Sequence, residues 1–306
     1  MAVLITGPSK GGIGALTAVN LAQAHPARLI LAGRTLSKIQ PVIDEIKQID
    51  ADIRVEFVSM DLASQASIRE GVAEVSKLTD TIDVVINNAG LMAIKDFTTT
   101  KEGIEMQFGA NHIGHFLLTN LLMPLLLNAA KANPKDATRV LSLSSNGYMT
   151  AGFRGSDYNF DNGKAYNPWL AYGQSKTANL LFTLSLAEKL KEKGIAAFAV
   201  MPGLVLESNL QDQIPSELFQ DGIEQSRKAF EGREAPPMDP PKEKKCSTST
   251  TVVAALDPDM GSDSGAYLQD CQVVPQDKME AHGKDAAAAK ELWALSEKLV
   301  GQKFDW

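Results

Sequence analysis

Tyr172 and Lys176 are the residues of this chain best suited to chemistry, because they stand four positions apart in the run Ala171–Thr177. Residues at i and i+4 share one helix face, so the spacing places a phenol beside an ammonium. An isolated Tyr has a pKa of roughly 10 and an isolated Lys roughly 10.4, so neither works well near neutrality. A neighbouring cation favours the phenolate, and we expect Lys176 to lower the pKa of Tyr172. The pair therefore predicts a proton donor and acceptor, although most such pairs merely decorate a helix surface.

A glycine-rich turn strengthens this interpretation. It directly follows the short apolar run Ala2-Val3-Leu4-Ile5 and reads Thr6-Gly7-Pro8-Ser9-Lys10-Gly11-Gly12-Ile13-Gly14. A strand that turns through glycines into a helix offers backbone N–H groups and a helix N-terminus to a pyrophosphate. The motif therefore stands in the structural context that it needs.

The bulk composition limits the choice of partners and compartments. With 306 residues and 44% hydrophobic content, the chain can bury a large core. Its net charge of −7 argues against nucleic acid or an anionic membrane as the main partner. The two cysteines, Cys246 and Cys271, have neither metal-ligand nor disulfide-framework spacing, which predicts a reduced, cytoplasmic protein.

Neither a metal site nor a membrane segment is expected. His112 and His115 stand one turn apart, but no acidic or Cys ligand pattern accompanies them. The longest apolar stretch, 116–127, is too short for a membrane span and is broken by Asn and Pro, so we interpret it as a buried helix. The first apolar run is too short for a signal peptide, and the chain opens on it directly, which favours a soluble protein.

The order of apolar and helical stretches predicts an α/β fold. Continuous apolar runs that alternate with helical stretches indicate a doubly wound, Rossmann-type parallel sheet with helices on both faces, in a single domain over 1–306. The expected strands are 2–6, 28–33, 53–58, 82–86, 138–143, 195–201 and one around 265–268. The expected helices are roughly 12–25, 36–50, 64–79, 103–131, 170–193, 215–230, 247–256 and 285–300.

Residues 204–245 interrupt this alternation with a polar, loop-like insertion. The proline-rich stretch 236–242 can be neither helix nor inner strand. A long irregular insertion beside a sheet edge is usually functional or disordered. We interpret it as a lid over a substrate pocket, with an inert linker as the alternative.

Four motifs in order give the chain a resemblance to the short-chain dehydrogenase/reductase family. They are the glycine turn, Asn87-Asn88-Ala89-Gly90, Tyr172 with Lys176, and Pro202-Gly203. The resemblance covers 1–270. Within the family the chain looks most like the retinol dehydrogenase and WW-domain oxidoreductase branch, through the runs Asn111–Thr119 and Ala171–Asn179.

The resemblance implies catalytic roles for four side chains. Tyr172 would protonate the carbonyl oxygen as hydride arrives, and Lys176 would bind the nicotinamide ribose and lower the pKa of Tyr172. Ser145 would hold the substrate oxygen, and Asn111 would anchor a water relay to Lys176. Fixed donors of this kind would stabilise the developing alkoxide charge. The alternatives are a strand-end hydroxyl cap for Ser145, with Ser144 as a stand-in, and a helix-interior group bonded to backbone for Asn111.

The resemblance also implies a nicotinamide-cofactor site. Asp61 and Leu62 match the family's adenine-contacting pair, with a helix N-cap as the alternative for Asp61. Asn87, Asn88 and Gly90 could instead only fix the sheet and strand end beside the cofactor. The expected cofactor-binding residues are Gly7, Ser9, Lys10, Gly12, Ile13, Gly14, Arg34, Asp61, Leu62, Asn88, Ala89, Gly90, Tyr172, Lys176, Pro202 and Gly203.

The residues after the second expected strand favour NADP(H) over NAD(H). A carboxylate there would bind the ribose diol of NAD and repel a 2′-phosphate. This strand ends instead in Gly33-Arg34-Thr35, and Arg34 can pair with a phosphate through two N–H bonds. Lys10 adds a second cation, unless it is only a solvated loop charge.

Several positions depart from the family pattern. The glycine turn has one residue more than Thr-Gly-x-x-x-Gly-x-Gly, so either Gly11 or Gly12 could take the second glycine position. Met201 stands before Pro202 where this branch often has His. The segment 204–208 also has one residue more than the family pattern. These departures concern the cofactor edge and the pocket rather than the chemistry.

Together these features predict an NADP(H)-dependent oxidoreductase that interconverts a hydrophobic ketone or aldehyde and its alcohol. Its pocket would be lined by 146–153, the residues after Gly90 and the 204–245 lid. The alternative is a non-redox protein on the same fold, such as a cyclase, an isomerase or an NADPH-sensing regulator. Because the helices at 103–131 and 170–193 are apolar over more than one face, we also expect a homodimer.

Overall fold

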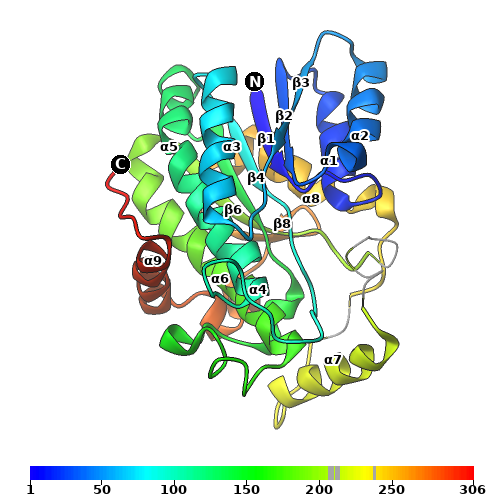
Figure 1. Ribbon diagram of the computed structural model, residues 1–306, viewed down its shortest axis with the longest axis vertical. Coiled ribbons are helices and arrows are strands. Elements are labelled where there is room, and N and C mark those ends of the chain that lie inside the picture. The colour runs from blue at the N-terminus through cyan, green and yellow to red at the C-terminus, as the bar shows by residue number, and fades with distance from the viewer. Residues whose placement is uncertain (206–209, 211–213, 237–238) are drawn as a thin grey trace.

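Parallel strands form the centre of the molecule (Figure 1). The computed structural model describes residues 1–205, 210, 214–236 and 239–306. They build an eight-stranded sheet in the order β3-β2-β1-β4-β5-β6-β7-β8. The strands are β1 Ala2–Thr6, β2 Arg28–Gly33, β3 Arg54–Ser59, β4 Val84–Asn87, β5 Thr138–Leu143, β6 Ile195–Met201, β7 Tyr267–Gln269 and β8 Gln272–Val273. All neighbours pair in parallel except β7 and β8. The predicted doubly wound fold is confirmed. The antiparallel β8 was missed, because a strand of two residues is too short to show a hydrophobic pattern.

Helices cover both faces of the sheet, as expected. They are α1 Ile13–Ala22, α2 Leu36–Ile49, α3 Gln65–Leu78, α4 Met106–Phe108, α5 Gly114–Ala132, α6 Pro168–Leu190, α7 Ser216–Ala229, α8 Ser249–Leu256 and α9 Ala286–Val300. Successive strand residues point to opposite faces, so Val3 and Ile5 pack with α1, α2 and α8, while Leu4 packs with α3, α5, α6 and α9. Burial on both faces explains why the strands are apolar throughout.

The longest apolar helix runs without a break from Met106 to Ala132 and contains a π-helical segment, Gly109–Ile113. Glu105 caps its start by accepting hydrogen bonds from the N–H groups of Gln107 and Phe108. The helix has 27 residues and continues through Pro124, so by length and composition alone it could cross a membrane. Its apolar window is 67% buried inside the protein. Burial, rather than the short length read from the sequence, marks it as a core helix.

The C-terminal helix covers apolar surface of α5 and α6. The ring of Trp293 in α9 lies 5.0 Å from that of Phe116 and 6.0 Å from that of Phe182. Trp306 packs on Trp293 and donates a hydrogen bond from Nε1 to Oδ1 of Asn120 at 2.9 Å. The expected homodimer rested on apolar surface left over on α5 and α6, and α9 occupies part of that surface within the chain.

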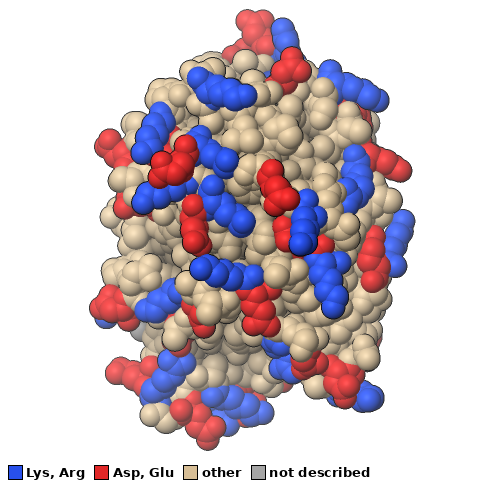
Figure 2. All heavy atoms as spheres, turned by 90° about the vertical axis from the view of Figure 1, so that its left-hand side faces the viewer, with Lys and Arg blue, Asp and Glu red and all other residues tan. Residues whose placement is uncertain are grey.

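Figure 2 views the side of the molecule on which α5, α9 and the C-terminus lie in Figure 1. Acidic and basic side chains are interspersed over this side. Mixed charge of this kind is typical of a surface that faces water.

The aromatic contacts of α9 make a stability prediction. Trp293 is 7% exposed, and its removal leaves a cavity against Phe116 and Phe182. Trp293→Ala should lower the free energy of unfolding by about 3–5 kcal/mol, the usual cost of truncating a buried large aromatic residue. Urea unfolding followed by circular dichroism measures the change, with the exposed Lys290→Ala on the same helix as control. Equal stability of the two variants would show that α9 is not part of the cooperative core.

Candidate active site

Helix α6 carries the Tyr172 and Lys176 pair at its buried N-terminal end. Asn167 caps the helix by accepting hydrogen bonds from the N–H groups of Trp169 (3.0 Å) and Leu170 (3.1 Å), and Pro168 takes the first turn. Tyr172 and Lys176 are each 5% exposed. The Lys176 Nζ lies 5.6 Å from the centre of the Tyr172 ring, so the helical spacing does place the two groups side by side.

The electrostatics of this pair differ from the sequence-based expectation. Burial raises the pKa of Tyr172 to about 12, and a hydrogen bond with Ser145 offsets part of that rise. Burial lowers the pKa of Lys176 to about 8. The ammonium donates to the carbonyl of Leu143 at 2.9 Å rather than to the phenol. The expected lowering of the Tyr172 pKa by Lys176 is therefore wrong for this arrangement, because desolvation outweighs the neighbouring cation.

Ser145, rather than Ser144, faces the Tyr172 phenol. Its hydroxyl follows β5 and also accepts a hydrogen bond from the N–H of Gly147 at 3.1 Å, so it caps this turn as well. The Ser144 Oγ donates instead to the carbonyl of Lys176 at 2.9 Å and is 2% exposed. Ser144 is thereby fixed inside the core and does not replace Ser145.

Asn111 lies in the π-helical segment and holds the loop after β4. Its Oδ1 accepts from the N–H of Leu91 at 2.7 Å, and its Nδ2 donates to the Leu91 carbonyl and to Ser175 Oγ, each at 2.9 Å. The Asn111 side chain therefore bonds to backbone groups, as the alternative interpretation of this residue predicts. A Cβ atom on Gly90 would lie 3.5 Å from Asn111 Oδ1 and 3.6 Å from Lys176 Nζ, which places both side chains beside Gly90. Single π-helical turns frequently occur at functional sites.

The glycine turn can accommodate a pyrophosphate. Helix α1 begins after Gly12, which occupies its N-cap without a side-chain cap, so the first N–H groups of the helix lack an intrahelical partner. Gly11 has φ +87° and lies in the turn before the cap, while Gly12 is itself the N-cap. A Cβ atom on Gly14 would lie 2.3 Å from Asn88 Nδ2, so only glycine fits there. These features suit the phosphates of a dinucleotide.

The carboxyl ends of β1 and β4 are joined by hydrogen bonds beside this turn. Asn88 Nδ2 donates to the Thr6 carbonyl at 2.7 Å. The N–H groups of Asn88 and Ala89 donate to Thr6 Oγ1, each at 3.0 Å. A Cβ atom on Gly7, where φ is +68°, would lie 2.9 Å from that of Ala89. Asn88 and Ala89, at the end of β4, therefore fix the position of the glycine turn.

The residues expected at the adenine end lie in the segments that follow β1, β2 and β3. Arg34 directly follows β2 and is exposed, while the N–H of Lys10 donates to the Lys38 carbonyl at 2.9 Å. Asp61 is not a helix cap, because Ser64 caps α3; its Oδ1 accepts instead from the N–H of Ala63 at 3.0 Å. Leu62 packs against the core.

The end of β6 meets the returning part of the insertion. Gly203 has φ +100°, and a Cβ atom there would lie 2.4 Å from Lys242 Cδ. Lys242 forms an ion pair with Asp270 and donates its N–H to the Leu204 carbonyl at 2.8 Å. The extra residue expected near 204–208 falls largely on positions outside the described residues.

Two further parts of the insertion contact the neighbours of Ser145 and Tyr172. Asp239 accepts hydrogen bonds from Asn146 Nδ2 (2.7 Å) and Gln269 Nε2 (2.9 Å). The indole N–H of Trp169 donates to the Leu218 carbonyl of α7 at 2.7 Å, and its ring lies edge to face with Tyr172 at 6.5 Å. Figure 1 shows α7 at the lower end of the molecule.

Sequence reasoning missed these insertion contacts. Asn167-Pro168 signals a helix start, but nothing in the sequence predicts the hydrogen bond between Trp169 and α7. Asp239 stands among prolines without any sign of its partners. His115 was considered only as a metal ligand, whereas the structure gives it a different environment, with Thr6 and the Asn111 carbonyl as its partners.

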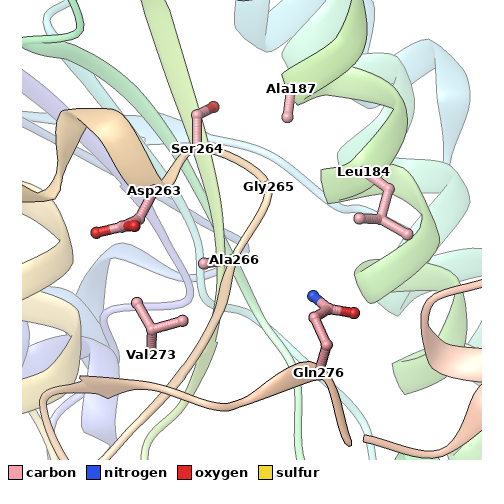
Figure 3. Close-up of a pocket in the computed structure, with 8 residues that line it drawn as sticks. All are labelled: Leu184, Ala187, Asp263, Ser264, Gly265, Ala266, Val273 and Gln276. Atoms are coloured by element: carbon pink, nitrogen blue, oxygen red, sulfur yellow. The ribbon is translucent and has the colours of Figure 1, made fainter.

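A hollow among the described residues does not coincide with this chemistry (Figure 3). It measures about 340 Å³ and lies between Leu184 and Ala187 of α6 and the loop 263–266, with Val273 and Gln276 below. Tyr172 stands 12 residues before Leu184, roughly 18 Å along the helix at 1.5 Å per residue. We place the site on the converging side chains, because the hollow lacks the Tyr, Lys, Ser and Asn set and its one carboxylate, Asp263, has no Lys or His beside it in the lining.

Metal ligands are not gathered in the part of the chain that the structure describes. No group of three or more His, Cys, Asp or Glu side chains could hold an ion there. His112 and His115 bond to separate partners, Ser296 Oγ and Thr6 Oγ1, each at 2.9 Å. The described site therefore consists of hydroxyl, amide and ammonium groups.

Comparison with known proteins agrees with this geometry. The family model described as short chain dehydrogenase matches residues 1–159. Retinol dehydrogenase 14 of Mus musculus is 32% identical over 309 residues, which cover 98% of this chain and 85% of that protein. Retinol dehydrogenase 13 of Homo sapiens is 33% identical over 302 residues, covering 98% and 84%.

Solved structures share the fold. An uncharacterized protein from Mycobacterium paratuberculosis superposes with a TM-score of 0.66 at 30% identity, covering 100% of this chain and 95% of that one. An NADPH-bound carbonyl reductase from chicken fatty liver gives 0.62 at 21% identity, covering 89% and 98%. An NADH-dependent reductase, A1-R′, complexed with NAD, gives 0.62 at 20% identity, covering 87% and 93%. At these identities the last two support the fold alone, and the fold serves both nicotinamide cofactors.

Proposed function

Because this chain belongs to the short-chain dehydrogenase/reductase family, in its retinol-dehydrogenase-like branch, we propose that it is an NADP(H)-dependent oxidoreductase of hydrophobic carbonyl compounds and alcohols. Family membership supports oxidation or reduction at CH–OH and C=O groups with a nicotinamide cofactor. The choice of NADP(H), the substrate class and the residue roles below are our proposal.

The observation that carries the proposal is the convergence of Ser145, Tyr172, Lys176 and Asn111 beside the glycine turn. Tyr172 and Ser145 share a hydrogen bond, while Lys176 and Asn111 meet beside Gly90. A cyclase or a cofactor sensor on this fold would not need the whole set. We therefore keep the non-redox function only as the alternative.

Each of these side chains takes a separate role in the reaction at one substrate oxygen. When bound, the nicotinamide supplies or accepts the hydride. In reduction the neutral phenol of Tyr172 donates its proton to the carbonyl oxygen, and the raised pKa keeps that proton in place near neutrality. Ser145 donates a second hydrogen bond to the same oxygen. Lys176 binds the ribose, and Asn111 holds the backbone beside Lys176 through Leu91 and Ser175.

The insertion supports the proposal of a substrate lid. Its described parts contact residues next to the catalytic pair: α7 bonds to Trp169, whose ring packs on Tyr172, and Asp239 bonds to Asn146, the neighbour of Ser145. Phe219 and Ile223 of α7 remain 42% and 58% exposed, which suits a hydrophobic ligand at the pocket entrance. Both cysteines are free thiols, which agrees with our proposal of a cytoplasmic protein.

The direct test is the loss of NADPH absorbance with a panel of hydrophobic ketones and aldehydes. Tyr172→Phe serves as the control that separates this activity from a contaminant. Turnover by the wild type that the variant lacks supports the proposal. Binding of NADPH without turnover of any carbonyl or alcohol would instead favour the sensing alternative.

Lys176 makes cofactor affinity dependent on pH. Its pKa of about 8 means that the ammonium is present below pH 8 and is lost as the pH rises through that value. Tyr172 does not titrate in this range, because its pKa is about 12. We expect the Kd of NADPH to rise between pH 7 and pH 9.5 as the ribose loses its charged donor. Fluorescence titration measures it, and Lys176→Met should bind weakly at every pH. A wild-type Kd that stays constant across this pH range would show that the charge of Lys176 does not control cofactor affinity.

A further inference from the structure

His115 is a buried group to which the catalytic scheme assigns no task. It is 2% exposed and lies one helical turn after Asn111. Its Nδ1 lies 3.0 Å from the Asn111 carbonyl oxygen, and its Nε2 lies 2.9 Å from Thr6 Oγ1. The ring thus spans the gap between the π-helical segment and the end of β1.

The partners of His115 determine which nitrogen carries the proton. A carbonyl oxygen only accepts hydrogen bonds, so Nδ1 must be protonated to bond to Asn111. Thr6 Oγ1 already accepts from the N–H groups of Asn88 and Ala89, each at 3.0 Å. Its own proton is therefore free to go to Nε2, since the other acceptor within reach, the Ile86 carbonyl, is 3.5 Å away. The partners of both ring nitrogens therefore require the same tautomer of His115, with the proton on Nδ1.

The neighbouring His112 provides an internal contrast. Ser296 Oγ donates to the Leu292 carbonyl at 2.7 Å, so it must accept from His112 Nε2 at 2.9 Å. The Nδ1 of His112 has no partner among the described residues and is left as a bare acceptor. Burial lowers the pKa of His112 to about 3 and that of His115 to about 4, so both rings are neutral. The two histidines should therefore carry opposite tautomers.

We infer that His115 is a positioning residue: as the Nδ1–H tautomer it ties the Thr6 hydroxyl, which supports the cofactor turn, to the backbone carbonyl of Asn111. One end of the ring steadies Thr6, Asn88 and Ala89 below the turn. The other end steadies the segment that carries Asn111 beside Lys176. This inference rests on the proposed function for its kinetic consequences, but not for the tautomer.

The first test is spectroscopic and needs no activity. In the full-length protein labelled with ¹⁵N, two-bond correlation spectra should show His115 with a protonated Nδ1 and a bare Nε2, and His112 with the reverse. The pattern for His115 should persist from pH 8 to pH 6, because its pKa is about 4. A proton on Nε2 of His115 would overturn the inference, whether or not the protein is an enzyme.

The second test separates the two ends of the ring. The Nδ2 of Asn reaches the position of His Nδ1, and the terminal amide of Gln reaches that of Nε2. We expect His115→Asn to keep the bond to Asn111 and retain kcat while raising the Kd of NADPH. His115→Gln should keep the bond to Thr6 and retain that Kd while lowering kcat. His115→Phe should both lower kcat and raise the Kd of NADPH, each by roughly fivefold, because each net hydrogen bond contributes about 1 kcal/mol.

His112→Phe is the matched control, since it removes a buried histidine that bonds to Ser296 in α9 rather than to the turn. It should change stability more than kcat or Kd. If His115→Phe also changes only stability, the inference fails. If the wild type turns over no carbonyl or alcohol, the proposed function fails, while the tautomers and the cofactor Kd still decide the role of His115.

Discussion

Replacing Tyr172 with Phe should lower turnover by roughly 100-fold or more and leave cofactor binding almost unchanged, because only the general acid is removed. The ring keeps its packing against Trp169, at 6.5 Å, and its burial. The measurements are steady-state rates of NADPH oxidation with an active carbonyl substrate and fluorescence titration of NADPH. A variant that keeps more than about a tenth of the wild-type rate would remove Tyr172 as the acid.

The expected effect of Lys176 differs in kind. Lys176→Ala should weaken NADPH binding and lower turnover together, since the ammonium lies beside the phenol and we propose that it also binds the ribose. It also removes one of the two side-chain donors to the Leu143 carbonyl, leaving only Asn179 Nδ2 at 2.9 Å, so folding must be checked by thermal unfolding. A Lys176 variant that loses turnover with an unchanged Kd would separate the two roles and contradict the ribose contact.

Replacing Arg34 with Asp should weaken NADPH binding by roughly two orders of magnitude or more, at 1.4 kcal/mol per decade. Hydrogen bonds from a guanidinium to a phosphate contribute about 1.5–3 kcal/mol, and the substitution adds repulsion to their loss. Arg34 is exposed, with no ion-pair partner among the described residues, so its charge is available to a ligand. NADH lacks the 2′-phosphate and should bind the variant as well as the wild type, or better.

The conditions and controls for Arg34 follow from its exposure. Salt screens exposed charges, so the titrations belong at low ionic strength and should weaken as salt is added. Arg54→Asp makes the same charge change at the start of β3, the opposite end of the neighbouring strand, and should leave both affinities unchanged. Lys10→Ala should give a smaller loss than Arg34→Asp, because an ammonium is a less specific phosphate partner. Equal affinity of the wild type for NADH and NADPH would refute the choice of NADP(H).

The sequence by itself determined the layers of the fold and the chemical types at the site. Apolar runs and helical periodicity predict β2, β5 and β6 with the residue ranges that the structure shows, because strands buried on both faces need continuous apolar residues. The i and i+4 spacing places Tyr172 beside Lys176, because helix geometry is local. Arg34 follows β2 for the same reason, since its position depends only on where a strand ends.

The tertiary structure alone decided what surrounds these groups. The raised pKa of Tyr172 depends on burial by segments far along the chain, which outweighs the cation four residues away. The choice of Ser145 over Ser144 depends on which hydroxyl reaches the Tyr172 phenol, because that of Ser144 donates to the Lys176 carbonyl instead. The tautomer of His115 depends on Thr6, 109 positions earlier in the sequence. Desolvation and hydrogen-bond partners come from residues distant in the chain, so no local pattern reports them.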